Sequence, residues 1–177
     1  MTGTTDTREQ TVEELTRELR VLEEVKTLKA RYFRYIDLKH WEALRGLFTP
    51  EARFEGLWAA GKDVDAFIAN ISRNLEGVFT AHHGYMPELS FLAPDRVSGI
   101  WAMSDRLEWV PDSRAYLGVS IPNQRGIHGY GYYEEEYQLT PDGWKIDFLR
   151  LSRLHIEPIV SPEPAALSGW LTPDIAD

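Results

Sequence analysis

The fold is decided by a stretch near the N-terminus, RYFRYIDLKHWEAL, which runs from Arg31 to Leu44. Its first half continues an apolar stripe that recurs at three- and four-residue steps, the spacing of one face of an α-helix. The stripe consists of Leu15, Leu19, Leu22, Val25, Leu28, Tyr32 and Ile36. We therefore expect a long amphipathic helix that begins near Glu9 and ends close to Asp37.

The second half of the stretch predicts a second helix, from about His40 to Phe48, which forms a hairpin with the first. We expect Thr49-Pro50 to end it, because the residue before a proline avoids the helical region. A short strand over residues 52–56 and a third helix over residues 64–71 follow from the apolar spacing.

The rest of the chain reads mostly as strand. Extended segments are expected at 78–84, 88–92, 97–110, 126–140 and 144–157, separated by turns that contain proline. Helices first and long antiparallel strands afterwards predict an α+β domain over residues 9–157. Residues 1–8 are expected to be a flexible tail. Residues 158–177 are expected to be a second tail, either docked on the domain or closing over a pocket as a lid.

Composition narrows the function. A chain of 177 residues fits one domain, and 19 Lys and Arg against 28 Asp and Glu give a net charge of −9. This charge argues against nucleic acid or an anionic membrane as partner and favours a small molecule. The absence of cysteine excludes disulfides and thiol nucleophiles. With no signal peptide and no apolar run of roughly 18 residues, we expect a soluble, cytoplasmic protein.

The chemistry is expected at His82-His83, which ends an apolar segment. Together with Asp37 and Tyr32 upstream, an imidazole there could form an acid–base centre that needs no metal or cofactor. If both histidines lie in a strand, they point to opposite faces, so at most one faces a pocket. No spacing of His, Asp and Glu stands out as a metal-ligand set, and no metal site is expected.

Several segments resemble one family. Besides the opening stretch and Leu47-Phe48-Thr49-Pro50-Glu51-Ala52, they are Thr80-Ala81-His82-His83, Asp95-Arg96-Val97-Ser98-Gly99, Trp101-Ala102-Met103-Ser104-Asp105-Arg106-Leu107, Gly131-Tyr132-Tyr133-Glu134-Glu135-Glu136-Tyr137 and Asp142-Gly143-Trp144-Lys145-Ile146. Over roughly residues 15–157 the chain resembles a SnoaL-like domain of the nuclear transport factor 2 (NTF2)-like superfamily. The most similar branch includes scytalone dehydratase, bile-acid 7α-dehydratase and hexachlorocyclohexane dehydrochlorinase.

The resemblance implies a cone in which a curved, mostly antiparallel sheet is wrapped by about three N-terminal helices around a deep pocket. It also implies cofactor-independent elimination, with Asp37 and His82 at the matching positions of the aspartate and histidine, and Tyr32 where the bile-acid enzyme has a tyrosine. A homodimer or homotrimer is implied as well. The second histidine and the serine–asparagine pair of scytalone dehydratase have no match, since Leu107, Gly131 and Tyr133 occupy those places.

Each candidate residue also has a structural alternative. Asp37 could simply cap the second helix, and Tyr32 could be a core residue. The candidates for substrate binding are Tyr133, Phe54, Trp58, His83, Trp101, Met103 and Phe148, although an ordinary core residue is the favoured interpretation of Phe54, Trp58, Trp101, Met103 and Phe148. For Asp105 and Arg150 a solvated or paired strand residue is the favoured interpretation.

The sequence thus predicts a cofactor-independent lyase of the dehydratase type, acting on a small hydrophobic substrate that is hydroxylated or polycyclic. His82 would remove a proton from carbon, Asp37 would hold the imidazolium, and Tyr32 or Tyr133 would assist the departing oxygen. The same base could serve an isomerase or a cyclase. A non-catalytic binding or assembly protein with the same fold is the alternative from a different class.

Overall fold

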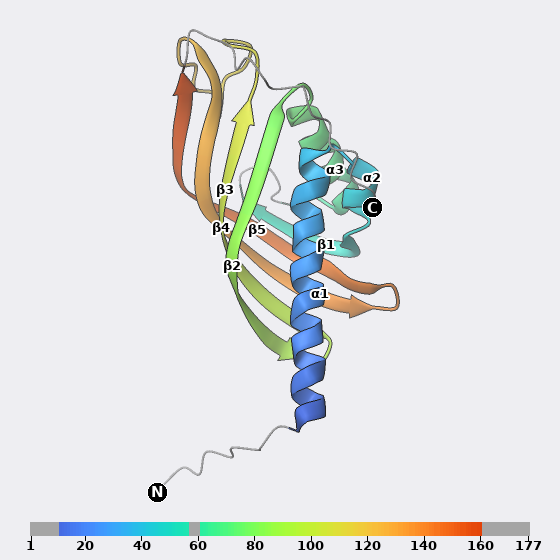
Figure 1. Ribbon diagram of the computed structural model, residues 1–177. Coiled ribbons are helices and arrows are strands. Elements are labelled where there is room, and N and C mark those ends of the chain that lie inside the picture. The colour runs from blue at the N-terminus through green and yellow to red at the C-terminus, as the bar shows by residue number, and fades with distance from the viewer. Residues whose placement is uncertain (1–10, 57–60, 161–177) are drawn as a thin grey trace, which may run out of the picture.

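The computed structural model describes residues 11–56 and 61–160. Three helices come first in the chain, interrupted by one strand: α1 (Val12–Asp37), α2 (Trp41–Arg45), β1 (Phe48–Gly56) and α3 (Val64–Asn74). Four long strands follow, β2 (Phe79–Ala93), β3 (Arg96–Glu108), β4 (Gln124–Thr140) and β5 (Gly143–Val160). The strands form one curved sheet, and the helices lie on its concave side (Figure 1). The α+β class expected from the sequence is confirmed.

The sheet has the strand order β1-β5-β4-β3-β2. The pairs β2–β3, β3–β4 and β4–β5 are antiparallel, whereas β1 runs parallel to β5. The sheet is therefore mostly antiparallel, as expected. Its last strand continues to Val160, past the expected end at residue 157.

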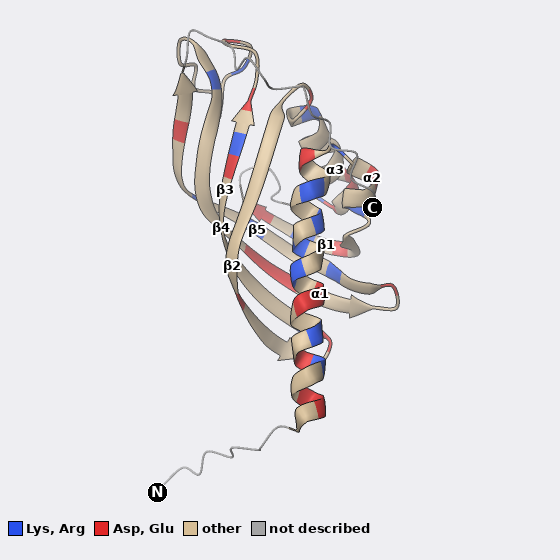
Figure 2. Cartoon of the chain, viewed as in Figure 1, with Lys and Arg blue, Asp and Glu red and all other residues tan. Residues whose placement is uncertain are grey.

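Helix α1 begins later than the apolar spacing alone suggested. Thr11 is its N-cap, and Thr11 and Glu14 form a reciprocal capping box that satisfies free amide groups at the helix start. The C-terminal part of the stripe, including Val25 and Tyr32, is buried, but Leu15 and Leu19 are exposed. Acidic and basic residues alternate along the rest of α1 (Figure 2).

The second helix is much shorter than predicted, and the prediction that Thr49-Pro50 ends it is wrong. Helix α2 stops at Arg45, and residues 48–50 already belong to β1. The chain can turn into a strand here because the Leu47 carbonyl accepts the Ile146 amide of β5. Pro50 is tolerated because it lies at a register shift of an edge strand, where no amide donor is required.

The predicted strands over 78–84 and 88–92 are one strand, β2. The pairing with β3 shifts register between Gly84 and Pro87, so the missing amide of Pro87 falls at a bulge. Gly84 leaves room for α1: a Cβ there would lie 2.5 Å from the Phe33 ring. This close approach brings the edge strand β2 against the C-terminal half of α1.

The main core fills the space between the helices and the concave face of the sheet. Its largest fully buried members include Tyr137, Leu44, Ile146 and Val25, and a smaller cluster forms around Val78, Trp109 and Ile127. Among the described residues, no helix is both long and apolar enough to cross a membrane.

Candidate active site

A cavity of about 350 Å³ lies between α1, α3 and the concave face of the sheet. Its walls are mainly apolar, with Ile36, Phe67, Ile71, Leu75, Val78, Leu107, Trp109, Leu149 and Leu151 among the lining residues. The polar side chains that reach it include Tyr32, His82, Asp105, Tyr133 and Arg153. An apolar cavity with a few convergent polar groups is the usual form of a small-molecule site.

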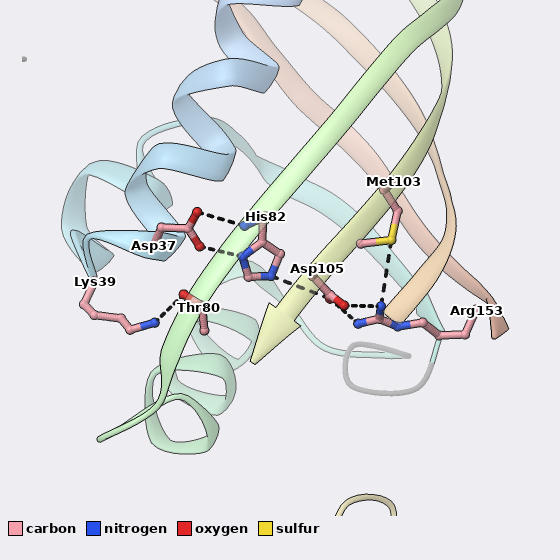
Figure 3. Close-up of polar contacts among 7 residues, drawn as sticks. All are labelled: Asp37, Lys39, Thr80, His82, Met103, Asp105 and Arg153. Carbon is pink, nitrogen blue, oxygen red and sulfur yellow. Dashed lines mark hydrogen bonds and ion pairs between the residues drawn. The ribbon is translucent and has the colours of Figure 1, made fainter. Parts of the chain in front are cut away.

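His82 is held by both oxygens of Asp37 (Figure 3). One oxygen lies 2.7 Å from the imidazole Nδ1, and the other accepts the His82 backbone amide at 2.9 Å. Because a carboxylate only accepts, Nδ1 carries a proton, and in the neutral imidazole Nε2 keeps its lone pair. The His82 side chain is only 7% exposed and lines the cavity.

The fold explains this pairing. Strand β2 is at the edge of the sheet, so alternate backbone amides have no partner strand and face α1. Asp37 is the last residue of α1 and meets one of these amides, that of His82. It does not cap α2, whose N-cap residue is His40. The alternative that Asp37 is only a helix cap is therefore wrong.

A second carboxylate faces the other imidazole nitrogen. Asp105 is directly opposite His82 in the pairing of β2 with β3, and its Oδ2 lies 3.9 Å from Nε2. Asp105 is 1% exposed and forms a two-point ion pair with Arg153 of β5, with Nη1 to Oδ1 at 2.7 Å. The distance to Nε2 is too long for a hydrogen bond, so Nε2 stays available to a substrate.

Gly129 makes the reach of Arg153 possible. This residue lies opposite Asp105 in the pairing of β3 with β4, between the strands that carry the two charges. A Cβ at this position would overlap both the Arg153 guanidinium and the Asp105 carboxylate. Because Gly129 has no side chain, the Asp105–Arg153 ion pair can form across β4.

Two phenols complete the polar side of the cavity. Tyr32 and Tyr133 are 3% exposed each, and their rings meet edge to face with centroids 5.8 Å apart. Burial raises the pKa of Tyr32 well above its usual value, and burial together with the nearby Asp105 charge raises the pKa of Tyr133. Both phenols therefore stay protonated near neutral pH and can donate hydrogen bonds to a substrate oxygen.

Lys39 supports the Asp37 end of the site (Figure 3). It adopts a positive φ of 61° just after α1, and its ammonium donates to the Thr80 hydroxyl at 2.7 Å. Burial lowers the pKa of Lys39 to about 8, although the Asp37 charge opposes this shift. The contact joins the residues just after α1 to the start of β2. It lies beside the Asp37–His82 pair, since Lys39 follows Asp37 by two residues and Thr80 precedes His82 by two.

The segment after β3 closes one side of the cavity. Arg114, Ala115 and Tyr116 line it, and the Arg114 guanidinium donates to the backbone carbonyls of Asn74, at 2.8 Å, and Glu76. These bonds tie the segment to the end of α3. The segment therefore forms part of the cavity wall that the sheet does not supply.

Some predicted pocket residues lie in the core beside the cavity and do not line it. Phe54 stacks on the lining residue Phe67, with centroids 4.2 Å apart. The Trp101 indole donates to the Tyr137 hydroxyl at 2.8 Å, and the Met103 sulfur lies 3.8 Å from Nη1 of Arg153. Phe54 and Met103 thus contact residues that line the cavity, whereas Trp101 contacts Tyr137, which does not line it.

Two other predicted pocket residues face away from the cavity, and Trp58 lies outside the described residues. His83 is exposed, since it follows His82 in the strand and points to the opposite face. Phe148 was expected inward, but a bulge at Asp147 reverses the alternation of β5 so that Ile146 and Leu149 are buried. The Phe148 ring packs instead against Arg53, whose guanidinium carbon lies 5.1 Å from the ring centroid.

Sequence reasoning underestimated Asp105 and missed Arg153. A usable signal existed for Asp105, because it continues the alternation of Trp101 and Met103, both of which were expected inward. Arg153 gave no such signal, since the register of β4 and β5 shifts between Tyr130 and Gly131. Arg150, the other cation considered, lies outside the site and pairs with Glu134 and Glu55.

Comparison with known proteins agrees with this architecture. A protein of Gibberella zeae named "Probable cyclase FGR4" is 27% identical over 144 residues, which cover 72% of this chain and 87% of the relative. The structure of a type 2 hexachlorocyclohexane dehydrochlorinase (LinA) superposes with a TM-score of 0.67 at 19% identity and covers 86% of this chain and 99% of its own.

A third protein, from Novosphingobium aromaticivorans and named provisionally as a scytalone dehydratase, has a TM-score of 0.66 at 14% identity. The superposition covers 83% of this chain and 93% of that one. These likenesses establish the NTF2-like cone. The family model of the SnoaL-like domain matches residues 17–150, which are most of the chain. The protein therefore belongs to the SnoaL-like domain family.

Proposed function

We propose that this protein is a cofactor-independent lyase in which His82 removes a proton from a substrate carbon. The single observation that carries the proposal is the Nδ1 contact of His82 with Asp37, because in the neutral imidazole it puts the lone pair on Nε2, in a side chain that lines an apolar cavity. A base in such a place needs no activation by water, and its protonated form is stabilised by the carboxylate behind it.

The elimination step involves one proton and one leaving group. The C–H electron pair becomes the new C=C bond while Nε2 takes the proton, and the neighbouring C–O bond breaks with its electron pair on oxygen. Tyr32 and Tyr133 donate hydrogen bonds to that oxygen as its charge develops. The proton on His82 then neutralises the departing hydroxide, so that the products are an alkene and water and the protein is unchanged.

The cavity indicates the substrate class. Apolar walls favour a hydrophobic body, while His82 and the two phenols favour a hydroxyl group next to an acidified C–H. Asp105 and Arg153 neutralise one another, and the Arg114 guanidinium, which also lines the cavity, is engaged by two backbone carbonyls. A neutral, hydroxylated ring system of modest size is the substrate that these features fit best.

Ring closure is the second candidate reaction. It is favoured by the relative from Gibberella zeae, whose name is that of a cyclase. Cyclisation and double-bond isomerisation both begin with the same proton abstraction, so they require the same nitrogen of His82. They differ from elimination in the fate of the carbanion, which depends on the substrate.

A non-catalytic binding protein needs no proton acceptor in its cavity. The open cavity and the orientation of Nε2 toward it support an enzyme instead. Incubating the protein with a panel of hydroxylated polycyclic ketones, and following loss of water or isomer formation by mass spectrometry and chromatography, tests the proposal. Conversion that is equally fast without protein or with His82→Ala would contradict it.

A further inference from the structure

A second set of titratable groups lies buried behind the cavity and takes no part in the proton transfer described above. Lys29 of α1 and Glu135 of β4 are both fully buried, and their side chains meet at 2.5 Å. Neither residue lines the cavity. A salt bridge without solvent exposure is costly to form, and replacing such pairs by apolar residues is often neutral or stabilising. This pair therefore calls for a role other than stability.

The Lys29 ammonium lies against the faces of the two cavity phenols. It is 3.6 Å from the ring centroid of Tyr133 and 4.0 Å from that of Tyr32, with Phe33 at 4.6 Å. A cation at this distance is attracted by the ring quadrupole, most strongly where water is excluded. The same ammonium thus contacts the rings of the two tyrosines that line the cavity.

Glu135 fixes this ammonium from the opposite side. Its second oxygen accepts from the Tyr137 hydroxyl, which in turn accepts the Trp101 indole N–H at 2.8 Å. Every member of this chain of contacts is buried. The ammonium is therefore held in one place relative to β4, the strand that also carries Tyr133.

We propose that Lys29 is a positioning residue that orients the Tyr32 and Tyr133 hydroxyls toward the oxygen of a bound substrate. The assignment rests on the proposed function, in which those phenols assist the departing oxygen. Lys29 acts through the rings and does not touch the substrate. Glu135 keeps the ammonium in place, and Tyr137 and Trp101 keep Glu135 in place.

The charge on Lys29 is sensitive to pH. Burial lowers its pKa to about 8, against the opposing effect of Glu135. The titratable groups that surround it are Glu135, Tyr137 and Tyr133 of β4 and Tyr32 of α1, and burial raises the pKa of all three tyrosines. Near pH 8, Lys29 therefore changes its charge while the three tyrosines stay protonated.

The test labels tyrosine with ¹³C at the ring carbon that bears the hydroxyl. The chain has eight tyrosines, and Tyr32→Phe and Tyr133→Phe assign the two resonances of interest. In the unmodified protein both resonances should shift with a common midpoint near pH 8. The midpoint should be lost in Lys29→Met combined with Glu135→Gln, a pair that removes both buried charges together.

Lys39→Met is the matched control, because burial lowers the pKa of Lys39 to the same region. The common midpoint should persist in this variant. If it vanishes with Lys39 instead of Lys29, or if the unmodified protein shows no common midpoint, the proposal is overturned. The absence of a common midpoint is measured on the unmodified protein. It can therefore overturn the proposal even if a variant fails to fold.

A binding measurement tests the orientation of the hydroxyls. The probes are 2-naphthol and naphthalene, which differ by one hydroxyl group. In the double variant the preference for 2-naphthol should fall about tenfold, the value of one hydrogen bond, while naphthalene affinity stays within about twofold. An equal loss for both probes would mean a merely structural role and overturn the proposal. His82→Ala tests the proposed function separately, since it should abolish turnover and leave the tyrosine midpoint unchanged.

Discussion

The Nδ1 of His82 lies 2.7 Å from one oxygen of Asp37, and the other oxygen of the same carboxylate accepts the backbone amide of His82. One side chain at the end of a helix thus fixes both the position of a strand and the tautomer of an imidazole. The contact is local to an edge strand, which has the free amide that makes it possible.

Asp37→Asn should separate these two roles. The amide keeps one acceptor oxygen and cannot serve both N–H groups of His82, so the tautomer is no longer fixed. We expect kcat/KM to fall about 10²–10⁴-fold, and the free energy of unfolding to fall by about 1–3 kcal/mol. Steady-state kinetics and urea unfolding measure the two effects. Unchanged kcat/KM in a folded Asp37→Asn protein would remove Asp37 from the site.

Gly129→Ala should disturb the site from within the sheet, on the face that carries Asp105 and Arg153. Its Cβ would collide with the Arg153–Asp105 pair, so one of the two must move. We expect a loss of about 1–3 kcal/mol in unfolding free energy. Gly46→Ala is the control, since the nearest atom to a Cβ there is 3.4 Å away and φ is −62°. Equal stability of the two variants would show that the pair does not need the open position.

Arg153→Met should be among the most destabilising single changes in the site. It leaves Asp105, which is 1% exposed, as a buried charge without its guanidinium partner. Removing one member of a buried pair typically costs about 3–5 kcal/mol. Adding Asp105→Asn should recover a large part of that loss, as measured by chemical unfolding. A double variant no more stable than Arg153→Met would contradict the pairing.

Stability should rise with pH above pH 8. Burial lowers the pKa of Lys29 in the folded state to about 8, while the unfolded chain keeps its ordinary value near 10.5. Between these values the unfolded state binds more protons, so unfolding becomes less favourable by on the order of 1 kcal/mol per pH unit. Lys39 acts in the same direction.

Above pH 10 the trend should reverse. The pKa of Tyr32, Tyr133 and Tyr137 is raised in the folded state, so these phenols ionise first in the unfolded chain. Urea unfolding at several pH values measures both the rise in stability above pH 8 and the fall above pH 10. In Lys29→Met combined with Glu135→Gln the rise above pH 8 should be markedly smaller. A rise of the same size in that variant would exclude Lys29 as its source.

The sequence predicted the parts of the molecule that depend on local pattern. The apolar stripe of α1 and the order of helices and strands follow from spacing, and the alternation within β2 separates His82 from His83. The predictions that went wrong involve positions where tertiary pairing overrides local preference. Pro50 reads as a helix terminator, yet an edge strand accommodates it.

The inward-facing set of β5 could not be predicted from alternation. A bulge at Asp147 turns Phe148 outward, and a second register shift near Gly131 brings Arg153 into the cavity. Bulges are decided by pairing with the neighbouring strand, which no single segment reveals. For the same reason the Asp105–Arg153 pair, which depends on the side-chain-free position of Gly129, became visible only in the assembled sheet.

The most direct test of His82 as the proton acceptor is the turnover of a hydroxylated polycyclic substrate by the unmodified protein and by His82→Ala. Circular dichroism and thermal unfolding should first establish that the variant is folded. If Nε2 of His82 is the proton acceptor, its loss should lower kcat/KM by about 10²–10⁴-fold. A folded His82→Ala protein that turns over the same substrate at an unchanged rate would contradict the assignment of His82 as the base.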